Sequence, residues 1–389
     1  MDPLESLFWV ILVAALAPVV ARVLPGKLPG VVFMLIGGVL IGPEVLANAD
    51  PDDMSLLSTI GLSFLFLLAG YELEPTLMRQ TPGRIAIRSW FVSAALSVAV
   101  TAVLYEAGVI TDFVAIAIGL TTTALGTLLP IVRDAGMLDG PLGPYIFAAG
   151  AVGEFLPIVA MALLLTSSGP IAGVFALVGM AGATLLALLL IRWVKRKGWS
   201  ERLRLPEEST GQTTLRWTLV LLAALVLVAD DFGLDVVLGA FLAGVVLRQW
   251  SPVSAESLER KLEAVGYGVF IPIFFVTSGM RLDVISIMEN PGRLLLFFVL
   301  LFVVRGLPQL VMYRGHLDRV QRWQMVFLTA TALPLLVALA DVGTASGLTL
   351  PENAAALVGA GALSVLVFPL VATTMRAAPA GESVETATG

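Results

Sequence analysis

Two ionisable side chains stand in the middle of long apolar stretches of this sequence, and both could take part in chemistry. Glu154 lies about ten residues into the stretch 144–166, and Arg305 lies about nine residues from the end of the stretch 294–313. At a rise of about 1.5 Å per residue, both are expected roughly 14–15 Å from the same edge of a bilayer. A charge inside a membrane costs several kcal/mol and typically marks an ion path or a proton relay. A structural ion pair between the two side chains is the alternative.

A threonine-rich pattern occurs twice in the sequence. Residues 121–126 read TTTALG and residues 329–334 read TATALP, and each copy interrupts an apolar stretch with glycine or proline. Unwound backbone inside a membrane is tolerated only where it lines a cavity or binds something. Alternatively, the threonines bond carbonyl groups of their own helices and the glycine favours close helix packing.

A carboxyl group and hydroxyl groups at one depth could hold an alkali cation, because hard cations prefer oxygen ligands. Burial raises the pKa of a carboxyl group and a nearby cation lowers it, so one such group can hold either a proton or a metal ion. We predict a transient alkali-metal and proton site made of Glu154, Thr121, Thr122, Thr123, Thr127, Thr329 and Thr331. Arg305 is the expected charge-compensating group, because a guanidinium stays protonated.

The composition excludes a water-soluble protein. Of the 389 residues, 58% are hydrophobic and 13% are charged, which is too apolar for a domain of this length to cover with polar surface. The sequence has no cysteine and a single histidine, His316, which excludes disulfide bonds, thiolate or histidine metal clusters and most catalytic triads. We therefore expect no enzyme activity, no resident cofactor and no nucleic-acid partner. The expected partner is the lipid bilayer.

The apolar stretches predict an all-α integral membrane protein. A helix needs about 20 apolar residues to cross the hydrocarbon core, and about 13 stretches meet that requirement. They lie at roughly 6–24, 29–46, 54–71, 86–106, 112–132, 144–166, 170–194, 214–230, 233–249, 264–280, 294–313, 321–341 and 353–374. Residues 1–375 are thus expected to form one transmembrane domain.

The basic residues predict how this domain is oriented. If successive spans cross the membrane in alternate directions, nearly all of the 23 lysines and arginines fall on one side of the membrane, with Arg281 and Arg293 on the other. The amino terminus is then outside and the carboxyl terminus cytoplasmic, with 195–212 as a cytoplasmic linker and 376–389 as a disordered cytoplasmic tail. The two threonine segments run in opposite directions, so 54–166 and 233–374 are expected to hold an inverted repeat, as in many secondary transporters.

Four segments are similar to a known family. They are residues 64–74 (FLFLLAGYELE), the interrupted segment 121–130, residues 238–244 (LGAFLAG) and residues 274–280 (FFVTSGM). In this order they resemble the monovalent cation:proton antiporter superfamily, in particular the membrane domains of the bacterial sodium/proton and potassium-efflux branch. The resemblance implies a homodimer in the plasma (inner) membrane of a prokaryote, with a dimerisation domain and a mobile elevator core. It also implies that the fifth and twelfth spans cross and that Arg305 is the basic residue of the family.

The sequence departs from this family at one position. The family usually carries an aspartate after the first broken helix, preceded by Asp, Asn or Gln, whereas this sequence has Gly153-Glu154. With Glu154 as the one carboxyl group expected at mid-membrane, we predict a secondary antiporter that exchanges protons for Na⁺ or K⁺ by alternating access, electroneutrally. A cation channel or efflux pathway of the same fold, and a transporter of another small solute, are the alternatives.

Overall fold

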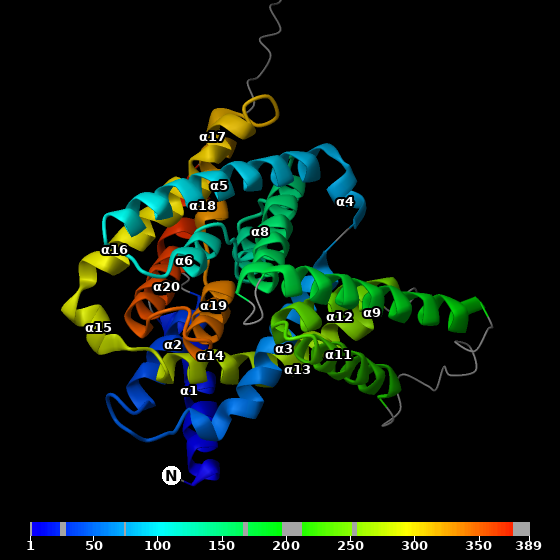
Figure 1. The fold of residues 1–389 in the computed structure, drawn as a ribbon, viewed down its shortest axis with the longest axis horizontal. Helices are drawn as coiled ribbons and strands as arrows, with labels where there is room; N and C mark the ends of the chain where they lie inside the picture. Colours follow the sequence, from blue (N-terminus) through cyan, green and yellow to red (C-terminus); the bar gives the residue numbers. More distant parts are fainter. Residues whose placement is uncertain are drawn as a thin grey trace, which may run out of the picture.

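The computed structural model describes residues 2–23, 29–73, 75–165, 170–196, 212–250 and 255–375, and all regular elements in these ranges are helices (Figure 1). The all-α fold is thus confirmed. Most of the predicted linker 195–212 and the whole predicted tail 376–389 lie outside the described residues.

Ten helical segments in these ranges are long and apolar enough to cross a membrane. They are Pro3–Val23, Asp52–Glu72, Thr81–Glu106, Gly143–Leu164, Gly173–Leu190, Thr213–Asp231, Leu258–Met280, Pro291–Met312, Arg319–Ala345 and Pro351–Thr374. Two shorter apolar helices, Gly30–Ile41 and Val236–Gln249, and an interrupted helix between 113 and 134 occupy the remaining stretches that the sequence predicts.

One group of helices packs mainly within itself, and we call it the framework bundle. It consists of α1 (Pro3–Val23), α2 (Gly30–Ile41), α3 (Ser55–Glu72), α9 (Pro170–Arg196), α11 (Thr213–Asp231), α12 (Val236–Trp250), α13 (Ala255–Val265), the π-helix η2 (Gly266–Phe270) and α14 (Ile271–Met280). Gly70 of α3 lies against the carbonyl group of Phe241 in α12, and Gly244 of α12 lies against that of Leu67. A Cβ atom at either glycine would collide with the facing carbonyl oxygen, so these glycines allow α3 and α12 to touch.

The other group contains both interrupted helices, and we call it the crossing bundle. It consists of α5 (Thr81–Glu106), α6 (Phe113–Gly119), α7 (Leu125–Asp134), α8 (Gly143–Leu164), α16 (Pro291–Leu300), the π-helix η3 (Leu301–Gly306), α17 (Pro308–Met312), α18 (Arg319–Ala330), α19 (Pro334–Ala345) and α20 (Pro351–Thr374). Two short helices, α4 (Pro75–Arg79) and α15 (Val284–Glu289), lie where the chain passes between the bundles. Figure 1 shows α9, α11 and α12 on the opposite side of the molecule from α16 and α20.

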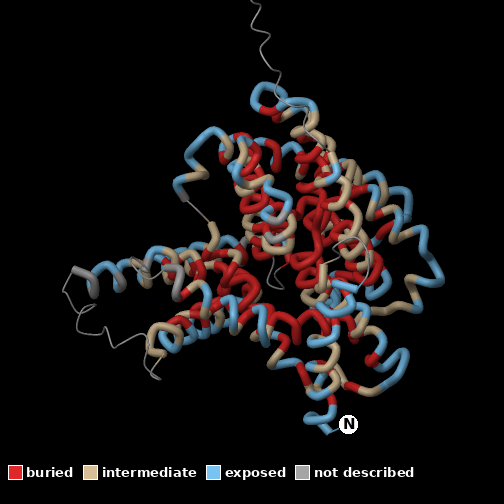
Figure 2. The backbone as a smooth tube through the Cα atoms, turned by 180° about the vertical axis from the view of Figure 1, so that it is seen from behind, coloured by how far each residue is buried: buried red, intermediate tan, exposed pale blue. Residues whose placement is uncertain are grey.

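The outer surface of the molecule suits a lipid environment. Figure 2 shows the buried residues concentrated in the interior, with exposed residues along the outer helices. Large apolar side chains are among the exposed ones, for example Phe8, Phe91 and Phe175. A soluble monomer rarely exposes apolar surface on this scale.

The loops at one end of the molecule are joined by carboxylate groups. Asp112 Oδ2 accepts hydrogen bonds from Leu350 N at 2.8 Å and Asn353 Nδ2 at 2.9 Å, and Glu44 Oε2 accepts one from Val284 N at 3.1 Å. We call this the acidic end. Helix α6 begins here and α19 ends here, so the two interrupted helices run in opposite directions, as the inverted repeat predicts.

Helix ends at the opposite end of the molecule carry arginines that bind carbonyl groups. Arg248 Nη1 donates to Tyr71 O at 3.2 Å, and Arg322 Nη1 donates to Leu310 O at 2.9 Å. We call this the basic end. The separation of the two ends agrees with the charge pattern in the sequence, while the side that each end faces in a membrane stays a prediction.

Candidate functional site

The interruptions of the two helices meet and bond to each other in the crossing bundle. Ala124 N donates to Thr331 O at 2.8 Å, and Thr123 Oγ1 donates to Thr329 O at 2.7 Å. Thr123 N also donates to Gly153 O of α8 at 3.0 Å. These contacts satisfy backbone groups that an unbroken helix would have satisfied internally, which is necessary where water is scarce.

Glu154 lies on α8 with its carboxyl group at the start of α7. Its Oε1 accepts hydrogen bonds from Leu125 N at 2.9 Å and from Gly126 N at 3.4 Å, and the residue is 6% exposed. The first N–H groups of a helix have no partner within the helix and carry the positive end of its dipole. The backbone N–H groups at the start of α7 therefore stabilise an anionic oxygen on the side chain of Glu154.

Arg305 lies in η3 and is 1% exposed, but it does not pair with Glu154. Its Nε donates to Thr123 Oγ1 at 2.9 Å, and its Nη2 donates to Ala149 O at 3.1 Å. The ion pair that the sequence left as an alternative is therefore absent, because the two side chains have separate partners. Arg305 instead connects the first interruption to α8, and its charge-compensating role stays a prediction.

The glycine at position 153 leaves space for this arginine. A Cβ atom at Gly153 would lie 2.6 Å from Thr123 Cβ and 2.8 Å from Arg305 Nη2. Such distances are shorter than van der Waals contact, so a side chain at 153 would have to displace one of these groups. The close packing around Thr123 and Arg305 thus favours glycine at position 153 of this chain.

The predicted threonines divide into two kinds. The Thr123 hydroxyl group bonds across the crossing, whereas the others donate mainly within their own helical segments, and Thr329 Oγ1 makes an additional, longer contact of 3.4 Å to Arg305 O. Their acceptors are Ile118 O for Thr121, Gly119 O for Thr122, Ala124 O for Thr127, Met325 O for Thr329 and Phe327 O for Thr331. The local hydrogen bonding considered as an alternative is therefore present, and it leaves the hydroxyl oxygens with free lone pairs.

Two residues near Glu154 were missed by the sequence analysis. Glu72, the last residue of α3, interacts electrostatically with Glu154, and its Oε2 is enclosed with no hydrogen-bond partner among the described residues. Tyr267 of η2 interacts electrostatically with both carboxyl groups. Glu72 stands at the end of an apolar stretch and not in its middle, although it belongs to the motif FLFLLAGYELE. Glu154 is therefore not the only carboxyl group at this site.

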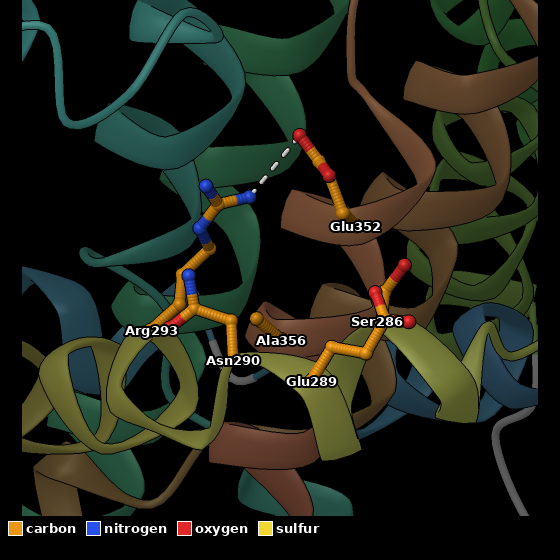
Figure 3. A pocket seen from close by; sticks show the side chains of 6 residues that line it. All are labelled: Ser286, Glu289, Asn290, Arg293, Glu352 and Ala356. Atoms are coloured by element: carbon orange, nitrogen blue, oxygen red, sulfur yellow. Dashed lines mark ion pairs between the residues drawn. The ribbon is translucent and has the colours of Figure 1, made fainter.

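A separate polar pocket lies at the acidic end, between α15, α16 and α20. It has a volume of about 280 Å³ and is lined by Ser286, Glu289, Asn290, Arg293, Glu352 and Ala356 (Figure 3). Arg293 Nη1 forms an ion pair with Glu352 Oε1 at 3.2 Å across it. None of the predicted site residues lines this pocket, so it is distinct from the crossing.

Two oppositely directed broken helices that cross beside a buried carboxyl group define a secondary-transporter fold. A family model described as "Sodium/hydrogen exchanger, transmembrane" matches residues 11–376. The chain belongs to this sodium/hydrogen exchanger family, and the resemblance deduced from the four motifs is confirmed.

Curated relatives of the chain are named as cation transport proteins. It is 25% identical to YjbQ of Bacillus subtilis, named as a Na⁺/H⁺ antiporter, over 87% of this chain and 57% of the relative. It is 28% identical to the glutathione-regulated potassium-efflux system protein KefC of Salmonella schwarzengrund, over 98% of this chain and 62% of the relative. It is 26% identical to a Na⁺/H⁺ antiporter of Enterococcus hirae, over 73% of this chain and 74% of the relative. The chain thus spans less than two thirds of YjbQ and KefC.

Solved structures share the fold. The sodium proton antiporter MjNhaP1 from Methanocaldococcus jannaschii superposes with a TM-score of 0.66 over 96% of both chains, at 16% sequence identity. At this identity the match supports the fold alone, and it agrees with the all-α membrane architecture predicted from the sequence.

Replacing Thr123 by valine tests the crossing contacts. Thr123→Val removes both the oxygen that Arg305 Nε binds and the hydrogen that the Thr329 carbonyl group accepts. Leaving a buried polar group without a partner costs about 1–3 kcal/mol. We therefore expect a melting temperature several degrees below that of the unmodified protein in detergent. Thr127→Val is the matched control, because the Thr127 hydroxyl group bonds only within its own segment. Equal melting temperatures for the two variants would contradict a structural role of the crossing contacts.

Proposed function

We propose that this protein is a secondary antiporter that exchanges protons for Na⁺ or K⁺, with Glu154 as the group that binds each in turn. The observation that carries the proposal is the asymmetry of the Glu154 carboxyl group. Its Oε1 is held by two backbone N–H groups of α7, while its Oε2 receives no hydrogen bond from the described residues and is not fully enclosed. The names of the family and of its relatives support the same class of activity.

The free oxygen explains why binding is competitive. A proton on Oε2 makes the carboxyl group neutral, and a monovalent cation at the same oxygen requires that proton to leave. Each ion therefore neutralises the same negative charge and excludes the other. Na⁺ and K⁺ are substrates in this scheme, and oxygen atoms of the interrupted segments 120–124 and 331–333 are available as further ligands.

Alternating access is proposed as a movement of the crossing bundle against the framework bundle. The whole site except Glu72 and Tyr267 belongs to the crossing bundle, so it can move as one body. Contacts between the bundles at the acidic end then close the site on that side. One such contact is Ser278 Oγ of α14, which donates to Asp341 Oδ2 of α19 at 3.4 Å. Separation of these two residues would accompany opening toward the acidic end.

The proposal also covers the orientation of the protein in the membrane, its oligomeric state and its location. The basic end faces the cytoplasm of a prokaryote, the acidic end faces outward, and the framework bundle provides the contact of a homodimer. The charge pattern of the loops supports the orientation. Both the homodimer and the plasma-membrane location follow from the family resemblance and stay predictions.

Substitution of Glu154 tests the ion-binding group. Glu154→Gln keeps an oxygen for the N–H groups of α7 but cannot exchange a proton for a cation. We expect it to fold and to lose coupled exchange in proteoliposomes, while Glu154→Asp retains exchange with an altered apparent cation affinity and pH optimum. Glu106→Gln, an exposed glutamate at the end of α5, is the control and should exchange normally. Normal coupled exchange by Glu154→Gln would exclude Glu154 as the ion-binding group.

A cross-link between the bundles tests alternating access. The protein contains no cysteine, so the pair Ser278→Cys and Asp341→Cys can be joined by a short bifunctional thiol reagent without side reactions. We expect the cross-linked protein to lose exchange and a reducible reagent to restore it on reduction. Each single cysteine variant, treated with the same reagent, is the control. Unchanged exchange after complete cross-linking would contradict movement at this contact.

The dependence of exchange on membrane potential tests the stoichiometry. One proton exchanged for one monovalent cation moves no net charge, and Arg305 does not titrate. With Na⁺ as substrate and the potential set by valinomycin and K⁺, we expect a steady-state rate that does not change with potential. A strong potential dependence that disappears in Glu72→Gln would contradict electroneutrality and identify Glu72 as a second proton carrier.

A further inference from the structure

Tyr267 brings a hydroxyl group of the framework bundle to the site on the crossing bundle. It lies in η2, a π-helix, whose wider turn changes the direction in which side chains leave the helix. A Cβ atom placed on Gly126 would lie 3.5 Å from the Tyr267 hydroxyl oxygen. The Gly126 N–H group is one of the two donors to Glu154. The hydroxyl group is therefore located at the start of α7, beside the carboxyl group.

Three oxygen atoms in this part of the molecule have no hydrogen-bond donor among the described residues. They are Glu154 Oε2, Glu72 Oε2 and the Tyr267 hydroxyl oxygen, for which the described residues provide no hydrogen-bond partner. Each of the three side chains interacts electrostatically with the other two. Anionic and neutral oxygens in such a group are suitable ligands for a hard monovalent cation, and the phenol oxygen is the neutral one.

The same residue is much more exposed than the buried carboxyl group. Tyr267 is 43% exposed, whereas Glu154 is 6% exposed. Glu263 of α13, which follows the basic end of α12, interacts electrostatically with Tyr267 as well. The tyrosine thus lies between the buried carboxyl group and the charged helix α13, on the side of the basic end.

We propose that Tyr267 is a cation ligand. The framework bundle contributes it to the cation only while the site is open to the basic end. The inference rests on the antiport proposed above. The phenol oxygen replaces one water of the cation's hydration shell beside Glu154. Because Tyr267 does not belong to the crossing bundle, it is left behind when that bundle moves, and the cation then loses this ligand. The site consequently binds its cation more tightly from the basic end than from the acidic end.

The test is exchange measured separately from each side in vesicles of known orientation, with Tyr267→Phe. This variant keeps the ring and removes only the oxygen. We expect the apparent KM for Na⁺ or K⁺ to rise about fivefold or more when the cation is supplied at the basic end, and to stay unchanged at the acidic end. Tyr105→Phe, an exposed tyrosine at the acidic end of α5, is the matched control and should change neither KM.

A role in packing alone would give a different result. If Tyr267 served packing alone, Tyr267→Phe would lower the stability of the protein or change both KM values together. Either result, without the one-sided change in KM, overturns the proposal. Gly126→Ala is the second variant, because its methyl group fits at 3.5 Å from the hydroxyl oxygen and should produce the same one-sided rise. If unmodified protein exchanges cations and Tyr267→Phe matches it on both sides, this inference fails while antiport stands. If the unmodified protein does not exchange cations, both fail.

Discussion

Interrupting a helix inside a membrane leaves backbone N–H and C=O groups that lipid cannot satisfy, and the structure around the crossing follows from this constraint. Some of the backbone groups left unpaired at the two interruptions bond to each other, because Ala124 N donates to Thr331 O. The N–H groups at the start of α7 are satisfied by the carboxyl group of Glu154. Arg305 then fixes Thr123, which in turn holds the second interruption. The proposed ion-binding group thus belongs to the same network that makes the interrupted helices stable.

Different kinds of contact hold the framework bundle together and join the two bundles. In the framework bundle, glycines such as Gly70 and Gly244 bring helices into backbone contact, which favours a rigid body. Contacts between the bundles include individual polar contacts such as that of Ser278 with Asp341. They also include the stacked rings of Phe155 in α8 and Phe241 in α12. The proposed relative movement would carry Glu154 and its backbone donors together while Tyr267 and Glu72 remain in place.

The sequence predicted the helices and their interruptions well, because apolar length and the glycine and proline positions are local signals. It also predicted a common depth for Glu154 and Arg305, but depth alone does not determine which partner a side chain meets. That depends on helix rotation, and η3 changes the rotation at Arg305. Glu72 and Tyr267 were missed for related reasons. The surroundings of a helix end and the direction of a side chain in the π-helix η2 both depend on tertiary packing.

The central claim is that one carboxyl group holds either a proton or a cation, and proton release on cation binding tests it most directly. Purified protein in weakly buffered detergent solution would receive Na⁺ or K⁺, with choline as the inert cation, over a series of pH values. The account predicts release of at most one proton per chain at the pH where the carboxyl group is protonated, and no release from Glu154→Gln. Equal release from both proteins, or no release from the unmodified protein at any pH, would contradict it.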